Sequence, residues 1–147
     1  MQISDGTVQI VAFSVDSVEY AFPISSVKEI IRYVEAQPTS STTPWMRGVI
    51  NLRGNIVPII DLGVRLGRER VAMDPTSAKI LVLEWEDLIV GAVVTSVDEV
   101  RTIEADQIQD APIGAGTSYM DAVVTIEDRL IMLLNAGSLV ALENVAA

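Results

Sequence analysis

The sequence matches itself at a nearly fixed shift, and this internal repeat limits the possible folds more strongly than any other feature. At the first shift, which carries Val11 onto Leu81, the segment Val11–Ile30 aligns with Leu81–Val100 without a gap. At a second and slightly larger shift, Val49–Leu62 aligns with Val123–Ala136. The small difference between the shifts can be absorbed by a single loop. Because the order of the matching units is also preserved, we infer a duplication. The two copies cover roughly residues 8–70 and 78–136.

Each half contains two units in which short runs of aliphatic, often β-branched residues flank a turn. The four predicted turns are Asp16-Ser17, Arg53-Gly54-Asn55, Glu86-Asp87 and Glu127-Asp128-Arg129. Four such units in a chain of 147 residues predict an all-β fold. Pro58 lies inside one of the runs, which predicts that its strand is an edge strand or carries a bulge.

The size of the halves constrains how they bury their apolar residues. Each half has about 70 residues and is too small to build a generous core alone. Two small β-barrels packed on each other would bury the apolar residues, which make up 50% of the chain. Closing each sheet would also remove exposed strand edges. We therefore expect two small barrels with a groove between them, accompanied by short helices.

The helical signals are short. Ser25–Ile31 has a capping serine and a glutamate near the third position, which predicts about two helical turns. Asp61–Leu66 is expected to form one turn that Gly67 closes, and Gly137–Val145 a C-terminal helix. The apolar face of that last helix would comprise Leu139, Leu142 and Val145. Two loops are predicted, over residues 37–44 and 112–118.

The composition excludes several classes of function. The chain has no histidine and no cysteine, and its net charge is −10. Disulfide scaffolds, thiolate zinc sites, cysteine nucleophiles and histidine-dependent triads are therefore excluded. The acidic total argues against nucleic-acid binding, since phosphates require clustered lysine and arginine. We expect no metal and no cofactor, and the composition favours a binding module over an enzyme.

Neither a signal peptide nor a membrane span is predicted. The first residues lack the basic and long apolar regions of a signal peptide. The longest apolar run, Leu88–Val94, is far shorter than the ~20 residues that a membrane-spanning helix needs. We expect a cytoplasmic protein without direct membrane insertion.

The charge is divided unevenly along the chain. Residues 1–78 have a net charge of −1, whereas residues 79–147 have a net charge of −9. One interpretation is electrostatic attraction between the halves together with solubility. The other is an arginine-bearing surface for an acidic partner and an acidic surface for a basic one. Five arginines of the first half are gathered in one short stretch: Arg47, Arg53, Arg65, Arg68 and Arg70.

Two charged residues are the sharpest candidates for a binding role. Arg53 lies in a turn beside a glycine, where packing does not require an arginine, and its counterpart Glu127 has the opposite charge. It is either a solvated turn residue or a contact residue. Glu29 is either an acid that stabilises its own helix or a partner of Arg53, and the first role is shared by its counterpart Glu99.

Patterns that could carry catalysis are weak. The carboxylates of Glu84, Glu86 and Asp87 surround a hairpin turn, which favours solvated side chains over calcium or acid–base chemistry. Gly114-Ala115-Gly116 lacks the strand and helix of a nucleotide site. Trp45 is either partial core or an anchor for a partner. A small-ligand binder or carboxylate enzyme that uses the groove is retained as an alternative function.

The segment Pro44–Gly67 resembles the CheW family of bacterial chemotaxis coupling proteins. The similarity is carried by the run Gly48-Val49-Ile50-Asn51-Leu52-Arg53-Gly54 and by Val57-Pro58-Ile59-Ile60-Asp61-Leu62 after it. Two further motifs fit the family, Val27-x-Glu29-Ile30 and Val90-Gly91-x-Val93-Val94-x-x-Val97. The resemblance extends over essentially the whole chain, so we treat residues 1–147 as a single CheW-like domain.

The resemblance implies two intertwined five-stranded β-barrel subdomains that exchange terminal segments. It also implies a non-enzymatic adaptor that binds the regulatory domain of a CheA-type histidine kinase and the cytoplasmic tips of chemoreceptors, and that is recruited to receptor arrays at the membrane. An adaptor of the same fold in another signalling pathway is the alternative. By motif, the receptor-binding or groove residues are Glu29, Ile30, Arg47 and Arg53, and the kinase-binding residues are Val27 and Gly48.

Overall fold

The computed structural model describes residues 6–41, 43–71, 74–110 and 119–140. The strands are β1 (Thr7–Val15), β2 (Val18–Pro23), β3 (Val27–Arg32), β4 (Met46–Leu52), β5 (Asn55–Asp61), β6 (Lys79–Trp85), β7 (Leu88–Val94), β8 (Ser96–Glu104), β9 (Ile108–Asp110), β10 (Met120–Ile126) and β11 (Arg129–Leu134). The helical elements are the α-helix α1 (Leu62–Arg65) and the 3-10 helices η1 (Ile24–Ser26) and η2 (Ala105–Gln107). Residues 136–140 are also helical.

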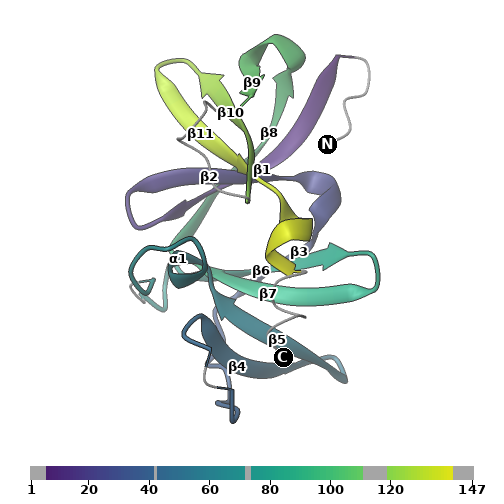
Figure 1. Ribbon diagram of the computed structural model, residues 1–147, viewed down its shortest axis with the longest axis vertical. Coiled ribbons are helices and arrows are strands. Elements are labelled where there is room, and N and C mark those ends of the chain that lie inside the picture. Colours follow the sequence, from purple (N-terminus) through teal and green to yellow (C-terminus); the bar gives the residue numbers. More distant parts are fainter. Residues whose placement is uncertain (1–5, 42, 72–73, 111–118, 141–147) are drawn as a thin grey trace.

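The strands form two curled sheets that stack along the long axis of the molecule (Figure 1). One sheet has the order β8-β1-β2-β11-β10-β9, and we call this part the six-stranded lobe. The other has the order β3-β6-β7-β5-β4 and forms the five-stranded lobe. The predicted all-β fold with two barrel-like subdomains is confirmed. The six-stranded lobe exceeds the expected five strands because the short β9 pairs with β10.

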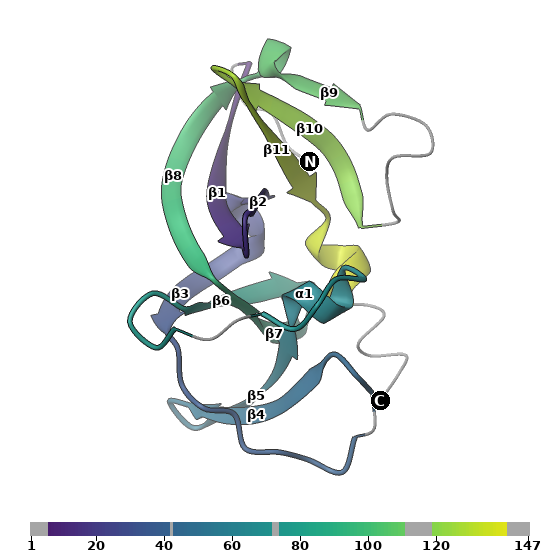
Figure 2. The same cartoon turned by 90° about the vertical axis from the view of Figure 1, so that its left-hand side faces the viewer.

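Each lobe contains strands from both halves of the chain. The hairpin β1–β2 joins β10–β11 through a parallel pairing of β2 with β11, in which Ala21 lies opposite Leu133. The hairpin β6–β7 joins β4–β5 through a parallel pairing in which Gly91 lies opposite Ile59. The two shifts of the internal repeat relate these contacts, because Ala21 aligns with Gly91 and Ile59 with Leu133. The first hairpin of each half therefore sits in the sheet that the other half completes (Figure 2).

This exchange explains why the first hairpins are apolar on both faces. Along β1, Val8, Ile10 and Ala12 point into the core of the six-stranded lobe. The alternate residues, such as Phe13 and Val15, belong to the larger core that continues into the five-stranded lobe. A strand covered on both faces loses the alternation of apolar and polar residues. The continuous apolar run at Leu88–Val94 has the same cause, because β7 is also buried between the lobes.

All four predicted hairpin turns are present as two-residue loops, and they share an unusual backbone conformation. The first loop residue has a positive φ, between 50° and 57°, in each of them. These four residues are Asp16, Arg53, Glu86 and Glu127. A positive φ is uncommon for residues other than glycine. The same positive φ occurs in four turns of different sequence. This indicates that the twist of the paired strands sets the turn geometry.

The helix predicted over Ser25–Ile31 is wrong. Only Ile24–Ser26 form a 3-10 turn, and Val27–Arg32 form the strand β3, which pairs with β6. The capping signal was weak, and pairing with an apolar strand gains more than one short helix, in which β-branched residues are disfavoured. Glu29 is consequently a strand residue, which removes its proposed role as a helix-stabilising acid.

The predicted edge position of Pro58 is also wrong, because β5 lies between β7 and β4. Pro58 is tolerated since the pairing with β7 begins only at Ile59, so the missing N–H interrupts no ladder there. The register shift lies in the partner strand β4, between Met46 and Gly48. Of the helical predictions, the turn at Asp61–Leu66 is confirmed as α1, with Asp61 as its cap.

Several predicted features lie outside the described residues. These are the loop over residues 112–118, the pair of glycines around Ala115, and the positions of Leu142 and Val145. In the described part of the chain, no helix is long and apolar enough to cross a membrane.

Candidate functional site

Arg53 and Glu29 form an ion pair at the surface of the five-stranded lobe. Nη2 of Arg53, in the β4–β5 turn, donates to Oε2 of Glu29 on β3. Because β3 and β4 are the two outer strands of this sheet, the pair connects its opposite edges. The Arg53 side chain is 66% exposed, so the pair contributes little to stability. The turn itself is held by Asn51, whose Oδ1 accepts from the N–H of Gly54 at 2.9 Å.

Two exposed aliphatic side chains are close to this pair in the sequence. Ile30 follows Glu29 on β3 and, because side chains alternate along a strand, it faces the opposite side and is exposed. Ile56 follows the Arg53 turn and is 65% exposed. Its position beside the Arg53 turn makes Ile56 a candidate contact residue.

The repeat places exposed aliphatic residues at the same positions of the six-stranded lobe. Val100 corresponds to Ile30, and Leu130, which is 65% exposed, corresponds to Ile56. Reading the sequence for strand alternation alone did not single out Ile56. Comparing the two copies residue by residue would have done so, because both keep an aliphatic residue just after the turn.

The charges around the corresponding turn of the six-stranded lobe are rearranged. Glu127 replaces Arg53, and Arg129 instead binds Glu19 at 3.1 Å and Glu99 at 3.4 Å. The hydrogen bond from Arg129 to Glu19, reinforced by Glu99, raises the pKa of Arg129 above its ordinary value. The acid on the strand thus keeps an arginine partner in both lobes, although the arginine comes from a different turn position.

The charge is divided as unevenly between the lobes as between the halves of the chain. The segments 7–23 and 96–134, which form the six-stranded lobe, hold ten acidic and two basic residues. The segment 24–94, which forms the five-stranded lobe, holds eight of each. The exchange of hairpins therefore leaves the arginine-bearing surface on a neutral lobe and the acidity on the other.

Arg47 lies away from the Arg53 surface and is buried. Its Nε and Nη2 donate to Oδ2 of Asp61 at 3.0 and 2.7 Å, and the two side chains are 5% and 1% exposed. Nη2 also donates to the carbonyl of Val71. Asp61 in turn accepts from the backbone N–H groups of Val64 and Val71. The pair therefore fixes α1 and the segment after it against β4.

Val27 and Gly48 are both parts of the framework of the five-stranded lobe. Val27 is half-buried against the larger core, beside the register shift in β3. Gly48 is buried with φ +139°, and a Cβ there would lie 2.1 Å from the carbonyl oxygen of Gln37. The missing side chain lets Gln37 cross β4 and exchange two hydrogen bonds with Val49, at 2.8 and 2.9 Å.

A buried arginine links the two halves of the chain. The guanidinium of Arg65 lies between Trp45 and Tyr119, 5.1 and 4.6 Å from the ring centroids, and its Nη1 donates to the Tyr119 hydroxyl at 2.5 Å. Its Nε and Nη2 have no hydrogen-bond partner among the described residues. Trp45, considered from the sequence as a possible anchor, therefore covers this arginine.

The carboxylates considered for catalysis do not converge. Glu84 pairs with Lys28 at 3.6 Å, and both side chains are about half exposed. Within the described ranges, no group of three or more acidic side chains is arranged to hold a metal ion.

Comparison with known proteins identifies the family. The model of the CheW-like domain matches residues 9–144, nearly the full chain. The chain belongs to the CheW family. It is 33% identical over 137 residues to the chemotaxis protein CheW of Klebsiella aerogenes, covering 91% of this chain and 82% of that protein. It is 31% identical over 140 residues to the CheW of Rhizobium meliloti, covering 92% and 89%.

A solved CheW structure has the same fold. The crystal structure of the scaffolding protein TtCheW from Thermoanaerobacter tengcongensis superposes with a TM-score of 0.80. That structure is 28% identical in sequence and the match covers 87% of this chain and 88% of the other. Members of this family are scaffolding or adaptor proteins, which agrees with the binding module favoured by the composition.

The buried pair of Arg47 and Asp61 generates a stability prediction. Asp61→Asn leaves a buried guanidinium without its counter-charge, so we expect the free energy of unfolding to fall by about 3–5 kcal/mol. Urea denaturation followed by circular dichroism measures the change. Glu84→Gln, which breaks the exposed pair with Lys28, is the control and should cost less than about 1 kcal/mol. Equal, small losses in both variants would show that the Arg47 pair does not hold the lobe.

Gly48 generates a second prediction. Gly48→Ala forces a Cβ into the backbone of Gln37, so we expect a loss of roughly 3 kcal/mol from the combined clash and positive φ. Gly67→Ala is the matched control, because Gly67 also has a positive φ but has nothing within 4 Å of a Cβ. The control should lose only about 1–2 kcal/mol. Thermal unfolding of both variants tests this difference, and equal melting temperatures would contradict it.

Proposed function

We propose that this protein is a non-enzymatic adaptor that couples methyl-accepting chemoreceptors to a CheA-type histidine kinase in signal transduction. The observation that carries the proposal is the exposed pair of Arg53 and Glu29, held by a turn with unfavourable backbone geometry in a member of the CheW family. Membership of a scaffolding family supplies the class of function, and the pair supplies the site.

Folding alone does not account for an arginine at this turn. An exposed ion pair contributes at most about 1 kcal/mol, and an arginine at positive φ costs part of that gain. Its counterpart in the other lobe is Glu127, so the hairpin does not require a cation. The nearby exposure of Ile56 adds apolar area that a partner can cover.

We assign the receptor contact to Arg53, Glu29 and Ile30. Arg47 would act indirectly, because it is buried and holds the segment around Asp61 in place. We assign the kinase contact to the region around Val27 and Gly48. Gly48 is buried, so its contribution would come from the path it allows Gln37 to take over β4.

Coupling requires that the partners favour different arrangements of the complex. A scaffold that contacts both signalling states of a receptor equally cannot transmit a change. Both proposed contacts lie on the five-stranded lobe, with the receptor contact at Arg53, Glu29 and Ile30 and the kinase contact around Val27 and Gly48. We propose that the protein works at receptor arrays on the cytoplasmic side of the membrane.

Arg53→Ala tests the proposal. We expect the affinity for receptor to fall about tenfold or more, as for a central arginine of an interface, and kinase stimulation to fall with it. The melting temperature should change little, because the ion pair is exposed. Two quantities are measured: binding of the protein to vesicles that contain the receptor, and phosphorylation of the kinase in a reconstituted mixture. The receptor and the kinase come from the same organism as this protein.

Arg101→Ala is the control, because Arg101 also pairs with an acid of the equivalent strand, Glu99 in the other lobe, although its side chain is 35% exposed against 66% for Arg53. The exchange Arg53→Glu with Glu29→Arg separates two modes of action. Recovery of activity in the exchanged protein indicates that the pair shapes the surface, whereas a lasting loss indicates direct contact by Arg53. Unchanged receptor binding and kinase stimulation in Arg53→Ala would refute the assignment.

A further inference from the structure

The second half of the chain repeats the surroundings of the Arg47–Asp61 pair with different chemistry. In the second alignment of the repeat, Asn135 occupies the position of Asp61, and Asp121 occupies that of Arg47. The backbone is the same in both places: the N–H of Asp61 donates to Trp45 at 2.7 Å, and that of Asn135 donates to the equivalent Tyr119 at 2.6 Å.

Both cap residues also start a helix in the same way. Oδ1 of Asp61 accepts from the N–H of Val64 at 3.1 Å, and Oδ1 of Asn135 accepts from the N–H of Ser138 at 3.0 Å. In the first copy, the guanidinium of Arg47 also donates to the carboxylate of Asp61. In the second copy, the one side-chain donor to the carboxylate of Asp121 among the described residues is the amide of Asn135, at 3.2 and 3.4 Å. The second copy therefore has a carboxylate and an amide where the first copy has a carboxylate and a guanidinium.

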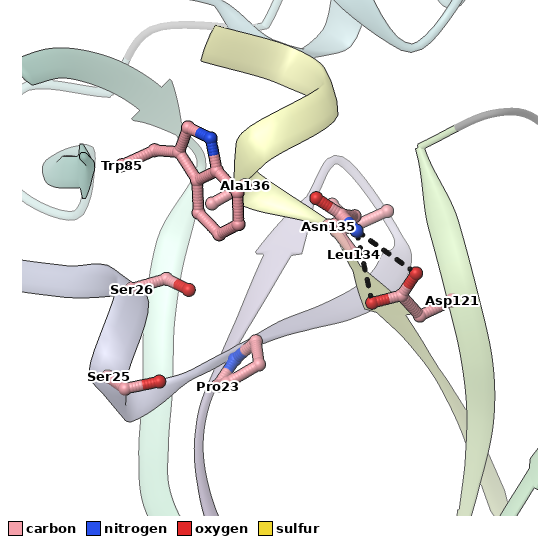
Figure 3. A pocket seen from close by; sticks show the side chains of 8 residues that line it. All are labelled: Pro23, Ser25, Ser26, Trp85, Asp121, Leu134, Asn135 and Ala136. Carbon is pink, nitrogen blue, oxygen red and sulfur yellow. Dashed lines mark hydrogen bonds between the residues drawn. The ribbon is translucent and has the colours of Figure 1, made fainter. Parts of the chain in front are cut away.

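A pocket opens at this place in the second copy. Its volume is about 370 Å³, and Figure 3 shows Trp85 and Asp121 on opposite sides of it, with Ser26, Ser25 and Pro23 below Trp85. Trp85 comes from the five-stranded lobe and Asp121 from the six-stranded lobe, so the pocket lies between the lobes. None of the described residues that line it is basic.

The walls of the pocket are held in place. A Cβ at Gly137 would lie 2.7 Å from the indole of Trp85, so the ring packs directly on the backbone of the helical segment. The equivalent Gly63 is covered instead by the carbonyl of Glu69. Trp85 nevertheless remains 43% exposed. Asp121 is fixed by Nδ2 of Asn135, which donates to its carboxylate. Oδ1 of Asn135 accepts from the backbone N–H of Ser138 in the helical segment.

We propose that this pocket binds an arginine side chain of a partner protein. The guanidinium would pair with the exposed carboxylate of Asp121, and the aliphatic stem would lie against Trp85 and Pro23. Arginine fits better than lysine because its planar head binds a carboxylate in bidentate fashion and stacks on aromatic rings. The excess of acidic residues on the six-stranded lobe favours the approach of a basic segment.

The test needs no chemotaxis partner, so it is independent of the proposed adaptor function. The probe is the capped peptide acetyl-Gly-Arg-Gly-amide, titrated into the isotope-labelled full chain and followed by nuclear magnetic resonance. We expect saturable shifts of the Trp85 indole N–H and the Asn135 side-chain amide, in the millimolar range of a single side chain. The indole of Trp45, which covers Arg65, serves as an internal reference that should not move.

Three comparisons decide the outcome. The same peptide with citrulline, which keeps the shape and removes the charge, should bind at least fivefold more weakly. Asp121→Asn should lose the same factor, whereas Asp128→Asn, at the far turn of β10, carries the same change in charge and should bind as the unaltered chain does. Trp85→Leu should also weaken binding. Equal binding of citrulline, unaltered binding to Asp121→Asn, or shifts that never saturate would each overturn the proposal.

Discussion

The structure depends on burial of the two first hairpins between the lobes. β1–β2 presents one apolar face to the core of the six-stranded lobe and the other to the larger core, and both faces of β6–β7 are buried in that larger core. A half of about 70 residues cannot cover both faces of such a hairpin alone. Pairing each hairpin with strands of the other half solves this problem, and it makes the lobes dependent on each other for their edges and their interior.

The duplicated scaffold carries different chemistry at equivalent positions. The Arg53 turn of one lobe becomes the Glu127 turn of the other, and the buried pair of Arg47 and Asp61 becomes the open pair of Asp121 and Asn135. The backbone hydrogen bonds around these positions are kept. Equivalent backbone positions therefore carry a structural ion pair in one copy and a carboxylate beside a pocket in the other.

Much of the fold could be predicted from single-residue patterns, and the errors have physical causes. The turns at Asp16, Arg53, Glu86 and Glu127 were found because they separate aliphatic runs. The helix over Ser25–Ile31 was wrong because pairing with β6 decides the conformation of that segment. The prediction that Pro58 lies on an edge strand was wrong. A proline is tolerated in an inner strand when the hydrogen-bond ladder on one side begins after it, as the ladder between β5 and β7 does. Each error concerns strand pairing, which joins segments that are far apart in the chain, as β5 and β7 are, and leaves no local signal.

The sequence by itself determined the duplication, the all-β class, the absence of histidine and cysteine chemistry and the motif around Arg53, because composition and spacing are properties of the chain. Only the tertiary structure decided that Arg53 meets Glu29 across the outer strands, that Arg47 is buried on Asp61, and that Trp85 and Asp121 face one pocket. Arg47 and Asp61 meet within the hairpin β4–β5, and the segment that follows it covers them. The Arg53 turn and β3 are held in one sheet by β6 and β7 of the other half, and the pocket lies between the two lobes. A contact of that kind depends on which sheet a hairpin enters, and that choice is made by the burial of both its faces.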